Sequence, residues 1–373
     1  MTVATIAPLL PTYARYPVTF VDGEGCWLVD EEGRRYLDLF AGIAVVGLGH
    51  CHPAPLEAAE AQLHRLWHVS NLYSTEPMLR LAELLSARFG GARAFFCNSG
   101  AEAIEAALKW ARKATGRTGF VALEGSFHGR TMGALSVTGQ PAKRAAFEPL
   151  VPGVRFATPA TLTEAVDDST AAIILEPVQG EGGVYPLGAE TLQLARDLAD
   201  THDALLILDE VQTGVGRTGA FFAWQRYGVE PDAVTLAKGL ANGLPIGALL
   251  VSDRAPVAFE PGDHASTFGG NPVSCAAACA VVDTVDDELL ERVLALGARF
   301  EAGLSAFGPV RGLGLMLAVE LGRPAGPYVE KALEHGLAIG TAGPTTLRIT
   351  PPLTISDDEA TLGLELLAEV LAA

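Results

Sequence analysis

The sequence predicts an α/β protein in which helices cover a mostly parallel sheet. Three observations carry this prediction: the chain has 373 residues, 49% of them are hydrophobic, and short apolar runs alternate with stretches of helical length. A chain of this size and composition can bury a large core and divides into about two domains. The apolar runs are residues 94–97, 119–123, 171–175, 204–208, 233–237 and 247–251.

The stretches between these runs carry the periodicity of amphipathic helices. Within residues 101–114, apolar side chains repeat at i, i+3, i+4 and i+7, which predicts a helix. A second helix is expected over residues 192–199, just before the run that begins at Ala204. Because helices connect successive strands in parallel sheets, this alternation favours a mostly parallel arrangement.

The two ends of the chain differ in pattern from its middle. Residues 18–39 contain two strand-like pieces with turn signals, and residues 275–373 mix Ala/Leu-rich helices with isolated strands. We expect both ends to join in a smaller α+β domain. The expected boundaries are 1–48 and 273–373 for this small domain and 49–272 for the large one.

Composition argues against several functional classes. The chain has 26 basic and 44 acidic residues, and its net charge of -18 repels nucleic acids and anionic membranes. Its apolar stretches are shorter than the ~20 residues needed to span a bilayer, and the N-terminus lacks a basic region before its weak apolar run. The five scattered cysteines fit reduced thiols. We therefore expect a cytoplasmic protein that binds neither nucleic acid nor a membrane.

No metal site is expected. His50-Cys51-His52 contains metal-binding residue types, but adjacent side chains point apart. No second ligand cluster follows at a zinc spacing.

Two of the apolar runs end in residues that indicate a cofactor. Asp209 follows the run 204–208, and Lys238 follows the run 233–237. In an open parallel sheet the carboxyl ends of the strands line the ligand crevice, so this carboxylate and amine can meet one small molecule. Pyridoxal phosphate needs both groups, because an amine forms a Schiff base with its aldehyde and a carboxylate keeps its pyridine nitrogen protonated. Taken alone, each residue is more typical of a surface lysine or a helix-capping aspartate.

The segment Asn98-Ser99-Gly100-Ala101-Glu102 lies between the first run and the first predicted helix. Free backbone N–H groups and the helix dipole make such a position a phosphate site. Ser99 and Glu102 also form the pattern of a simple capping box, and the two interpretations are compatible.

Two further segments follow strand ends. In the first, Phe127 could stack on a flat pyridine ring, and Arg130 could bind a substrate carboxylate through two hydrogen bonds. In the second, Glu176 and Glu181 place two carboxylates in a glycine-rich loop. Ordinary loop residues are the alternative for each segment taken alone.

Residues 214–219 match G-x-G-x-x-G, which would suggest a dinucleotide site. The context argues against that interpretation. Asp209 to Gln212 separate the glycines from the strand, bulky residues follow them, and no acidic residue ends a next strand at the expected spacing of ~20 residues.

With these motifs in order, the chain resembles the class III, ω-amino-acid branch of the fold type I pyridoxal phosphate aminotransferases nearly from end to end. Within the branch it is most similar to members that act on N2-acetyl-L-ornithine. The matching segments are LPTYARYPVTFVDGEGCWLVDEEGRRYLDLFAGIAVVGLGHCHP (10–53), SNLYSTEP (70–77), FFCNSGAEAIEAALKWAR (95–112), SFHGRTMGALSVTGQP (126–141), EPVQGEGG (176–183), LDEVQTGVGRTG (208–219), LAKGLANGLPIGA (236–248), STFGGNP (266–272) and LRITPPL (347–353).

The resemblance implies transamination between N2-acetyl-L-ornithine and 2-oxoglutarate, a step of arginine biosynthesis. Catalysis would fall to Lys238, which carries the cofactor and moves the proton, and to Asp209 at the pyridine nitrogen. Thr267 of the partner subunit would reach the phosphate, which implies a homodimer with shared active sites. The implied cofactor-binding set is Gly100, Ala101, Phe127, Asp209, Glu210, Val211, Gln212, Lys238 and Thr267.

Four residues are implied for the two substrates, which present their carboxylates differently. Ser266 and Arg130 would contact the acylated ornithine, with Arg130 at the carboxylate far from the reacting amine. Arg348 would bind the near carboxylate of glutamate, and Glu181 would neutralise Arg348 while acyl-ornithine is bound, because an unpaired buried arginine is costly.

Some features of the chain leave alternatives open. Val46 and Ile104 stand where the family commonly carries asparagine, so the polarity of the pocket is expected to differ. Related members act on ornithine, succinylornithine, 4-aminobutyrate or a lysine attached to a carrier protein, and the residues above do not exclude these donors. A non-enzymatic pyridoxal phosphate carrier or regulator is the remote alternative.

Overall fold

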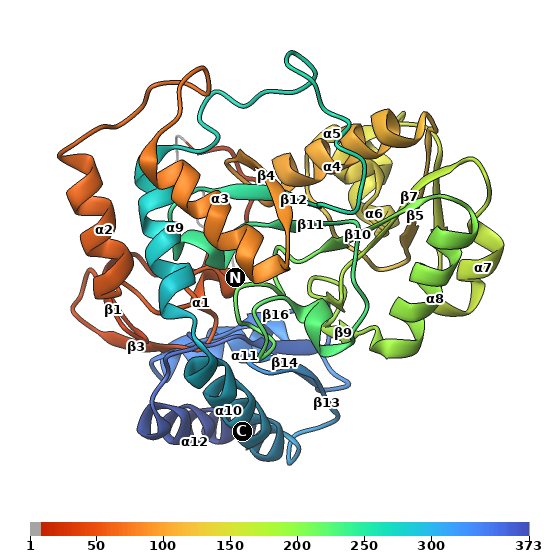
Figure 1. The fold of residues 1–373 in the computed structure, drawn as a ribbon. Coiled ribbons are helices and arrows are strands. Elements are labelled where there is room, and N and C mark those ends of the chain that lie inside the picture. The colour runs from red at the N-terminus through yellow and green to blue at the C-terminus, as the bar shows by residue number, and fades with distance from the viewer. Residues whose placement is uncertain (1–8, 373) are drawn as a thin grey trace.

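A seven-stranded sheet lies at the centre of the structure, a computed structural model that describes residues 9–372 (Figure 1). The strands lie in the order β4, β12, β11, β10, β7, β5, β6. Strand β12 runs opposite to the other six strands, which are parallel to one another, so the predicted α/β class with a mostly parallel sheet is confirmed. The bounds are β4 (Ala92–Cys97), β12 (Gly247–Ser252), β11 (Ala233–Leu236), β10 (Leu205–Asp209), β7 (Thr170–Leu175), β5 (Gly119–Leu123) and β6 (Val154–Ala157).

Alternate residues of the central strands face opposite sides of the sheet, as the two-residue period of a strand requires. Val121 and Leu206 enter a core formed with helices α3 (Glu76–Phe89), α8 (Gly188–Thr201) and α9 (Pro272–Thr284). Their neighbours Phe120 and Leu205 enter a second core, formed with α4 (Gly100–Thr115). Both faces are buried, which explains why these strands read as continuous apolar runs.

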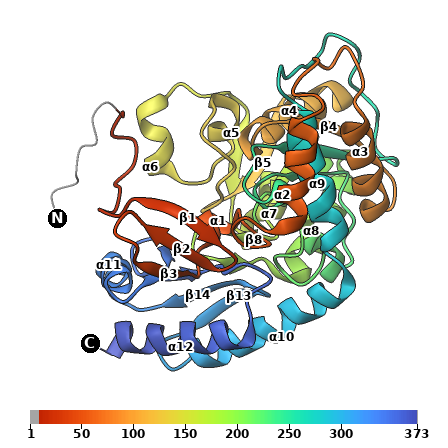
Figure 2. The same cartoon turned by 90° about the vertical axis from the view of Figure 1, so that its left-hand side faces the viewer.

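Smaller sheets join the two ends of the chain (Figure 2). One contains β1 (Phe20–Glu24), β2 (Trp27–Asp30), β3 (Arg35–Asp38) and β15 (Leu337–Ala338); the other contains β13 (Val310–Leu313), β14 (Met316–Glu320), β17 (Thr346–Ile349) and β16 (Gly340–Thr341). They share one core with α10 (Asp287–Leu304), α11 (Gly326–Glu334) and α12 (Asp357–Ala372). The domain boundaries after residues 48 and 272 stay a prediction, and residues 1–8 and 373 lie outside the described range.

Short elements complete the described part of the chain. They are α1 (Ala41–Ala44), α2 (Pro53–Leu63), α5 (Met132–Ser136), α6 (Pro141–Arg144), α7 (Leu162–Ala165), β8 (Val178–Gln179), β9 (Tyr185–Pro186) and the 3-10 turns η1 (Ala145–Phe147), η2 (Pro159–Thr161), η3 (Ala223–Arg226) and η4 (Lys238–Ala241).

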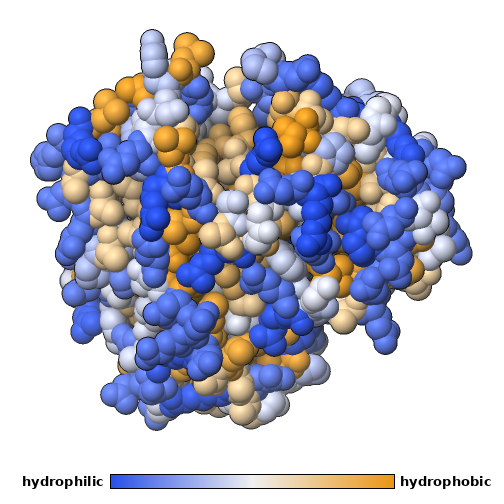
Figure 3. Space-filling model, viewed as in Figure 1, coloured by the Kyte–Doolittle hydropathy of each residue, from blue (hydrophilic) through white to orange (hydrophobic). Residues whose placement is uncertain are grey.

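Large apolar side chains remain exposed in the loop between α2 and α3. Trp67, Leu72 and Tyr73 are 67%, 86% and 69% exposed. Figure 3, viewed as in Figure 1, shows hydrophobic residues at the upper left edge of the molecule, where this loop lies. Among the helices of residues 9–372, none is long and apolar enough to cross a membrane.

Candidate functional site

A cavity of about 410 Å³ opens where the parallel strands of the central sheet end. Asp209 is the last residue of β10, and Lys238 comes two residues after β11 ends. These strands are neighbours and parallel, so the two side chains reach the same cavity. The lining residues are Val45, Asn98, Ser99, Gly100, Ala101, Phe127, His128, Gly129, Arg130, Glu176, Asp209, Val211, Gln212, Ala237, Lys238, Gly243, Leu244, Pro245 and Ile246.

Lys238 is held in an unusual backbone conformation. Its φ is +46°, in the left-handed region that residues with a Cβ rarely adopt. Burial lowers the pKa of its amine to about 8, so a larger fraction of the amine is neutral near physiological pH than for an exposed lysine. A neutral amine is the form that attacks an aldehyde.

Asp209 is buried and tied to a histidine that the sequence did not single out. His128 Nδ1 lies 2.7 Å from Asp209 Oδ2, and the two residues are 3% and 5% exposed. Burial alone would lower the pKa of His128, but the hydrogen bond to Asp209, with the charges of Asp209 and Glu176, raises it. Thr235 Oγ1 donates to the same carboxylate at 3.2 Å. The signal that could have identified His128 as a site residue is its position next to Phe127, in the loop after β5.

Glu176 holds two loops of the site together. Its carboxylate accepts hydrogen bonds from the amides of Phe127 at 2.8 Å and Gly180 at 3.1 Å. Burial raises the pKa of Glu176 to about 7. The residue therefore positions the Phe127 ring against the cavity and anchors the glycine-rich loop that carries Glu181.

The N-terminus of α4 forms an anion cradle. Ser99 caps this helix by accepting from the amide of Glu102, while within residues 9–372 the amides of Gly100 and Ala101 have no acceptor. A Cβ on Gly100 would lie 2.8 Å from the methyl groups of Val211, so only glycine fits there. Free amides at a helix N-terminus favour a phosphate, and the cavity therefore fits the phosphate of pyridoxal phosphate as well as its aldehyde and ring nitrogen.

Glu181, in the loop between β8 and β9, forms an ion pair with Arg348 on strand β17. Arg348 Nη1 donates to Glu181 Oε1 at 2.6 Å and lies 3.4 Å from Gln212 Oε1. Burial would raise the pKa of Glu181, but the charge and hydrogen bond of Arg348 hold it below its usual value. Arg348 is 2% exposed, and its Nε is buried without a partner among the described residues. The Nε–H group of Arg348 can therefore donate a hydrogen bond to a further carboxylate oxygen.

Other predicted residues lie at the edge of this arrangement or away from it. Ser266 Oγ accepts from Asn98 Nδ2 at 3.0 Å, and Thr267 is exposed. The carboxylate of Glu210 faces the core, where it accepts from the amides of η3 at 2.7 and 2.9 Å. Ile104 is on α4, where its side chain is buried in the core between this helix and the sheet, and it does not line the cavity.

The glycine motif at 214–219 has a structural use. Arg217, 3% exposed, donates to the carbonyl oxygens of Leu315 at 3.0 Å and of Pro351. The carbonyl of Arg217 accepts from the amide of Leu315 at 3.1 Å. The loop after Asp209 is thereby fastened to the sheet that carries Arg348.

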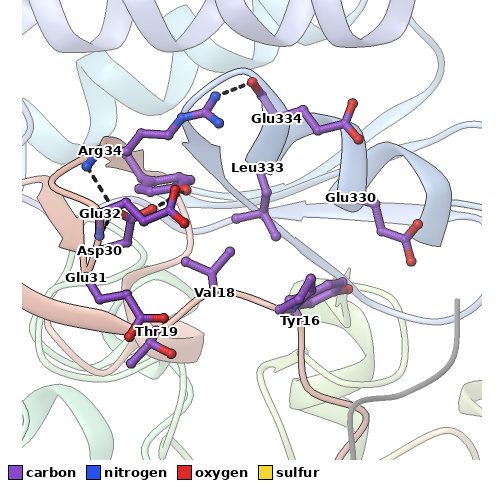
Figure 4. Close-up of a pocket in the computed structure, with 12 residues that line it drawn as sticks. Tyr16, Val18, Thr19, Asp30, Glu31, Glu32, Arg34, Glu330, Leu333 and Glu334 are labelled. Carbon is purple, nitrogen blue, oxygen red and sulfur yellow. Dashed lines mark hydrogen bonds between the residues drawn. The ribbon is translucent and has the colours of Figure 1, made fainter.

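A separate hollow of about 240 Å³ lies between the N-terminal segment and α11 (Figure 4). Two pairs of its residues are hydrogen-bonded: Tyr36 donates to Asp30 at 2.8 Å, and Arg34 donates to the main-chain oxygen of Glu334. Among residues 9–372 no lysine lines this hollow, so we place the chemistry in the cavity at the strand ends.

Comparison with known proteins agrees with this geometry. The model of the family "Aminotransferase class-III" matches residues 11–371. Acetylornithine aminotransferase of Archaeoglobus fulgidus is 48% identical over 364 residues, covering 96% of this chain and 97% of the relative. The ornithine aminotransferase of Toxoplasma gondii ME49 is 32% identical with a TM-score of 0.93, covering 98% and 92% of the two chains. A PLP-bound amine transaminase from an uncultivated Pseudomonas species is 30% identical with a TM-score of 0.89, covering 99% and 97%.

Proposed function

Because the chain belongs to the class-III aminotransferase family, which confirms the resemblance, we propose that it transfers the δ-amine of N2-acetyl-L-ornithine to 2-oxoglutarate. The products are N-acetylglutamate 5-semialdehyde and glutamate. The cofactor is pyridoxal phosphate, on which this family depends. The identity of 48% over nearly the full length to an acetylornithine aminotransferase supports this donor.

The observation that carries the proposal is the meeting of Lys238 and Asp209 at neighbouring strand ends in one cavity. Pyridoxal phosphate, when bound, supplies a protonated ring that withdraws electrons from the carbon bearing the reacting amine. Lys238 carries the proton to and from that carbon. Asp209, held by His128, keeps the proton on the ring nitrogen, and the amides of Gly100 and Ala101 bind the phosphate.

The two substrates need cations at different places. In acetylornithine the reacting amine is far from the carboxylate, whereas in glutamate the reacting amine is next to one. Arg130, exposed at the cavity rim, binds the remote carboxylate. Arg348 binds the near carboxylate of glutamate. This carboxylate takes the place of Glu181 as the partner of Arg348. Ser266 binds acyl-ornithine beside Asn98.

The assembly we propose is a homodimer with shared sites. Thr267 lies in an exposed loop beside Phe268, which is 60% exposed, and Thr267 of the partner subunit completes the phosphate site. The exposed Trp67, Leu72 and Tyr73 would be covered in such a dimer, since apolar side chains this large gain from burial.

A screen of amino donors against 2-oxoglutarate tests the function. N2-acetylornithine should give the highest kcat/KM, ahead of ornithine, succinylornithine and 4-aminobutyrate, with glutamate formed in equal amount to the aldehyde. A higher kcat/KM for one of the other donors would assign the chain to that reaction instead.

A further inference from the structure

The carboxylates in and next to the cavity already have partners inside the protein. Asp209 is hydrogen-bonded to a histidine, Glu181 to an arginine, and Glu176 to two backbone amides. Two cations beside the cavity differ in this respect. Within residues 9–372, neither Arg130 nor Lys143 has a carboxylate oxygen within 4.0 Å. In a chain with a net charge of -18, two cations without an acidic partner among the described residues indicate a place where an anionic ligand binds.

Both cations stand over the same ring. Lys143, on α6, places its Nζ 4.6 Å from the centroid of Phe127, and Arg130 places its Cζ 5.4 Å from that centroid. Phe127 and Arg130 line the cavity. The ammonium group of Lys143 therefore lies beside the Phe127–Arg130 side of the cavity, where the remote carboxylate is expected.

The surroundings of Lys143 favour an anionic ligand. Burial lowers the pKa of Lys143; Glu181 opposes this shift, while the positive charges of Arg130 and Arg348 add to it. Two neighbouring like charges repel each other, and a carboxylate bound between them removes that repulsion. The substrates of the proposed reaction supply such a group.

We propose that Lys143 is the second cation of the remote carboxylate site, where it binds this carboxylate together with Arg130. The inference rests on the proposed function and adds a residue to it. The remote carboxylate lies one bond farther from the reacting carbon in N2-acetylornithine than in glutamate. The flexible side chain of Lys143 can move its ammonium group to reach the carboxylate in either position. The planar guanidinium of Arg130 alone is less able to reach both positions.

Phe127 supplies the competing explanation, because a cation over an aromatic ring is itself stabilised by roughly 0.5–1 kcal/mol at exposed sites. If Lys143 only packs on the ring, its loss should affect all donors alike. If it binds the carboxylate, its loss should affect only donors that have one.

The test compares Lys143→Met with the wild type on two donors, N2-acetylornithine and N-acetylputrescine, which is the same molecule without the carboxylate. We expect kcat/KM for N2-acetylornithine to fall roughly 10-fold, mainly through KM, and that for N-acetylputrescine to change less than about 2-fold. Lys143→Arg should keep most of the activity. Lys331→Met, a lysine on α11, is the control and should match the wild type.

Binding of glutarate, a dicarboxylate without an amine, gives a readout independent of turnover. Isothermal titration calorimetry on the holoenzyme should show the same roughly 10-fold weakening for Lys143→Met. Equal losses for both donors, or unchanged glutarate binding, would overturn the inference.

The proposed donor is tested separately, by the wild type. If the wild type does not use N2-acetylornithine, the proposed function fails. The role of Lys143 is then decided on the glutamate half-reaction, with L-norvaline as the donor that lacks the remote carboxylate.

Discussion

Replacing Arg348 with alanine should damage the glutamate half of the reaction and largely spare the acyl-ornithine half. Arg348 is 2% exposed and donates to Glu181 at 2.6 Å, so its charge is held away from water. Glutamate would replace Glu181 in this pair, and loss of one partner of a buried charge pair costs about 2–5 kcal/mol. The value of kcat/KM for glutamate should therefore fall roughly 30-fold to several thousandfold.

Stopped-flow measurement of each half-reaction separates the two effects. Arg196→Ala is the matched control, because Arg196 is also paired, with Asp232 at 2.8 Å, but lies on α8. Glu181→Ala should act in the opposite sense, by freeing Arg348 for α-amino acids and weakening the preference for the ω-amine. Equal losses in both halves for Arg348→Ala would refute the exchange of partners.

Three further predictions concern the cofactor end of the cavity. Asp209→Asn should retain the cofactor but slow proton transfer by roughly 10²–10³-fold, because the ring nitrogen loses its charged partner; near-normal single-turnover rates would contradict this role. His128→Gln should lower the melting temperature below pH ~6.5, where the histidine is charged, and the difference from the wild type should shrink as pH rises through the raised pKa of His128; a difference that grows with pH would exclude a charged pair. Capture of pyridoxal phosphate by the apoprotein should accelerate with pH around a midpoint of about 8, set by the Lys238 amine; a midpoint near the ordinary 10.5 would show that the amine is not desolvated.

Much of the central sheet could be predicted because its strands are buried on both faces. The run 119–123 coincides with β5, and α4 extends the predicted helix by one residue at each end. Strand β6 was missed. It has four residues, includes the polar Arg155, and pairs with one neighbour at the edge of the sheet, so no continuous apolar run marks it.

The residues at the strand ends were also predictable, but their partners were not. His128 and Asp209 are separated by 81 positions, and no local pattern reports a contact of that range. The direction of Glu210 follows from the alternation of a strand: its neighbour Asp209 faces the cavity, so Glu210 faces the core. The pairing of Glu181 with Arg348 was implied by the family resemblance. In the structure Arg348 Nη1 lies 2.6 Å from Glu181 Oε1.

Borohydride reduction of the purified holoenzyme, followed by peptide mapping, tests the central claim most directly. The claim is that the cofactor is bound by the lysine that follows β11, beside the carboxylate that ends β10. The protein should be yellow before reduction, and the cofactor should be fixed on the peptide that contains Lys238. A label on Lys109 or Lys143 instead would contradict the assignment of the site.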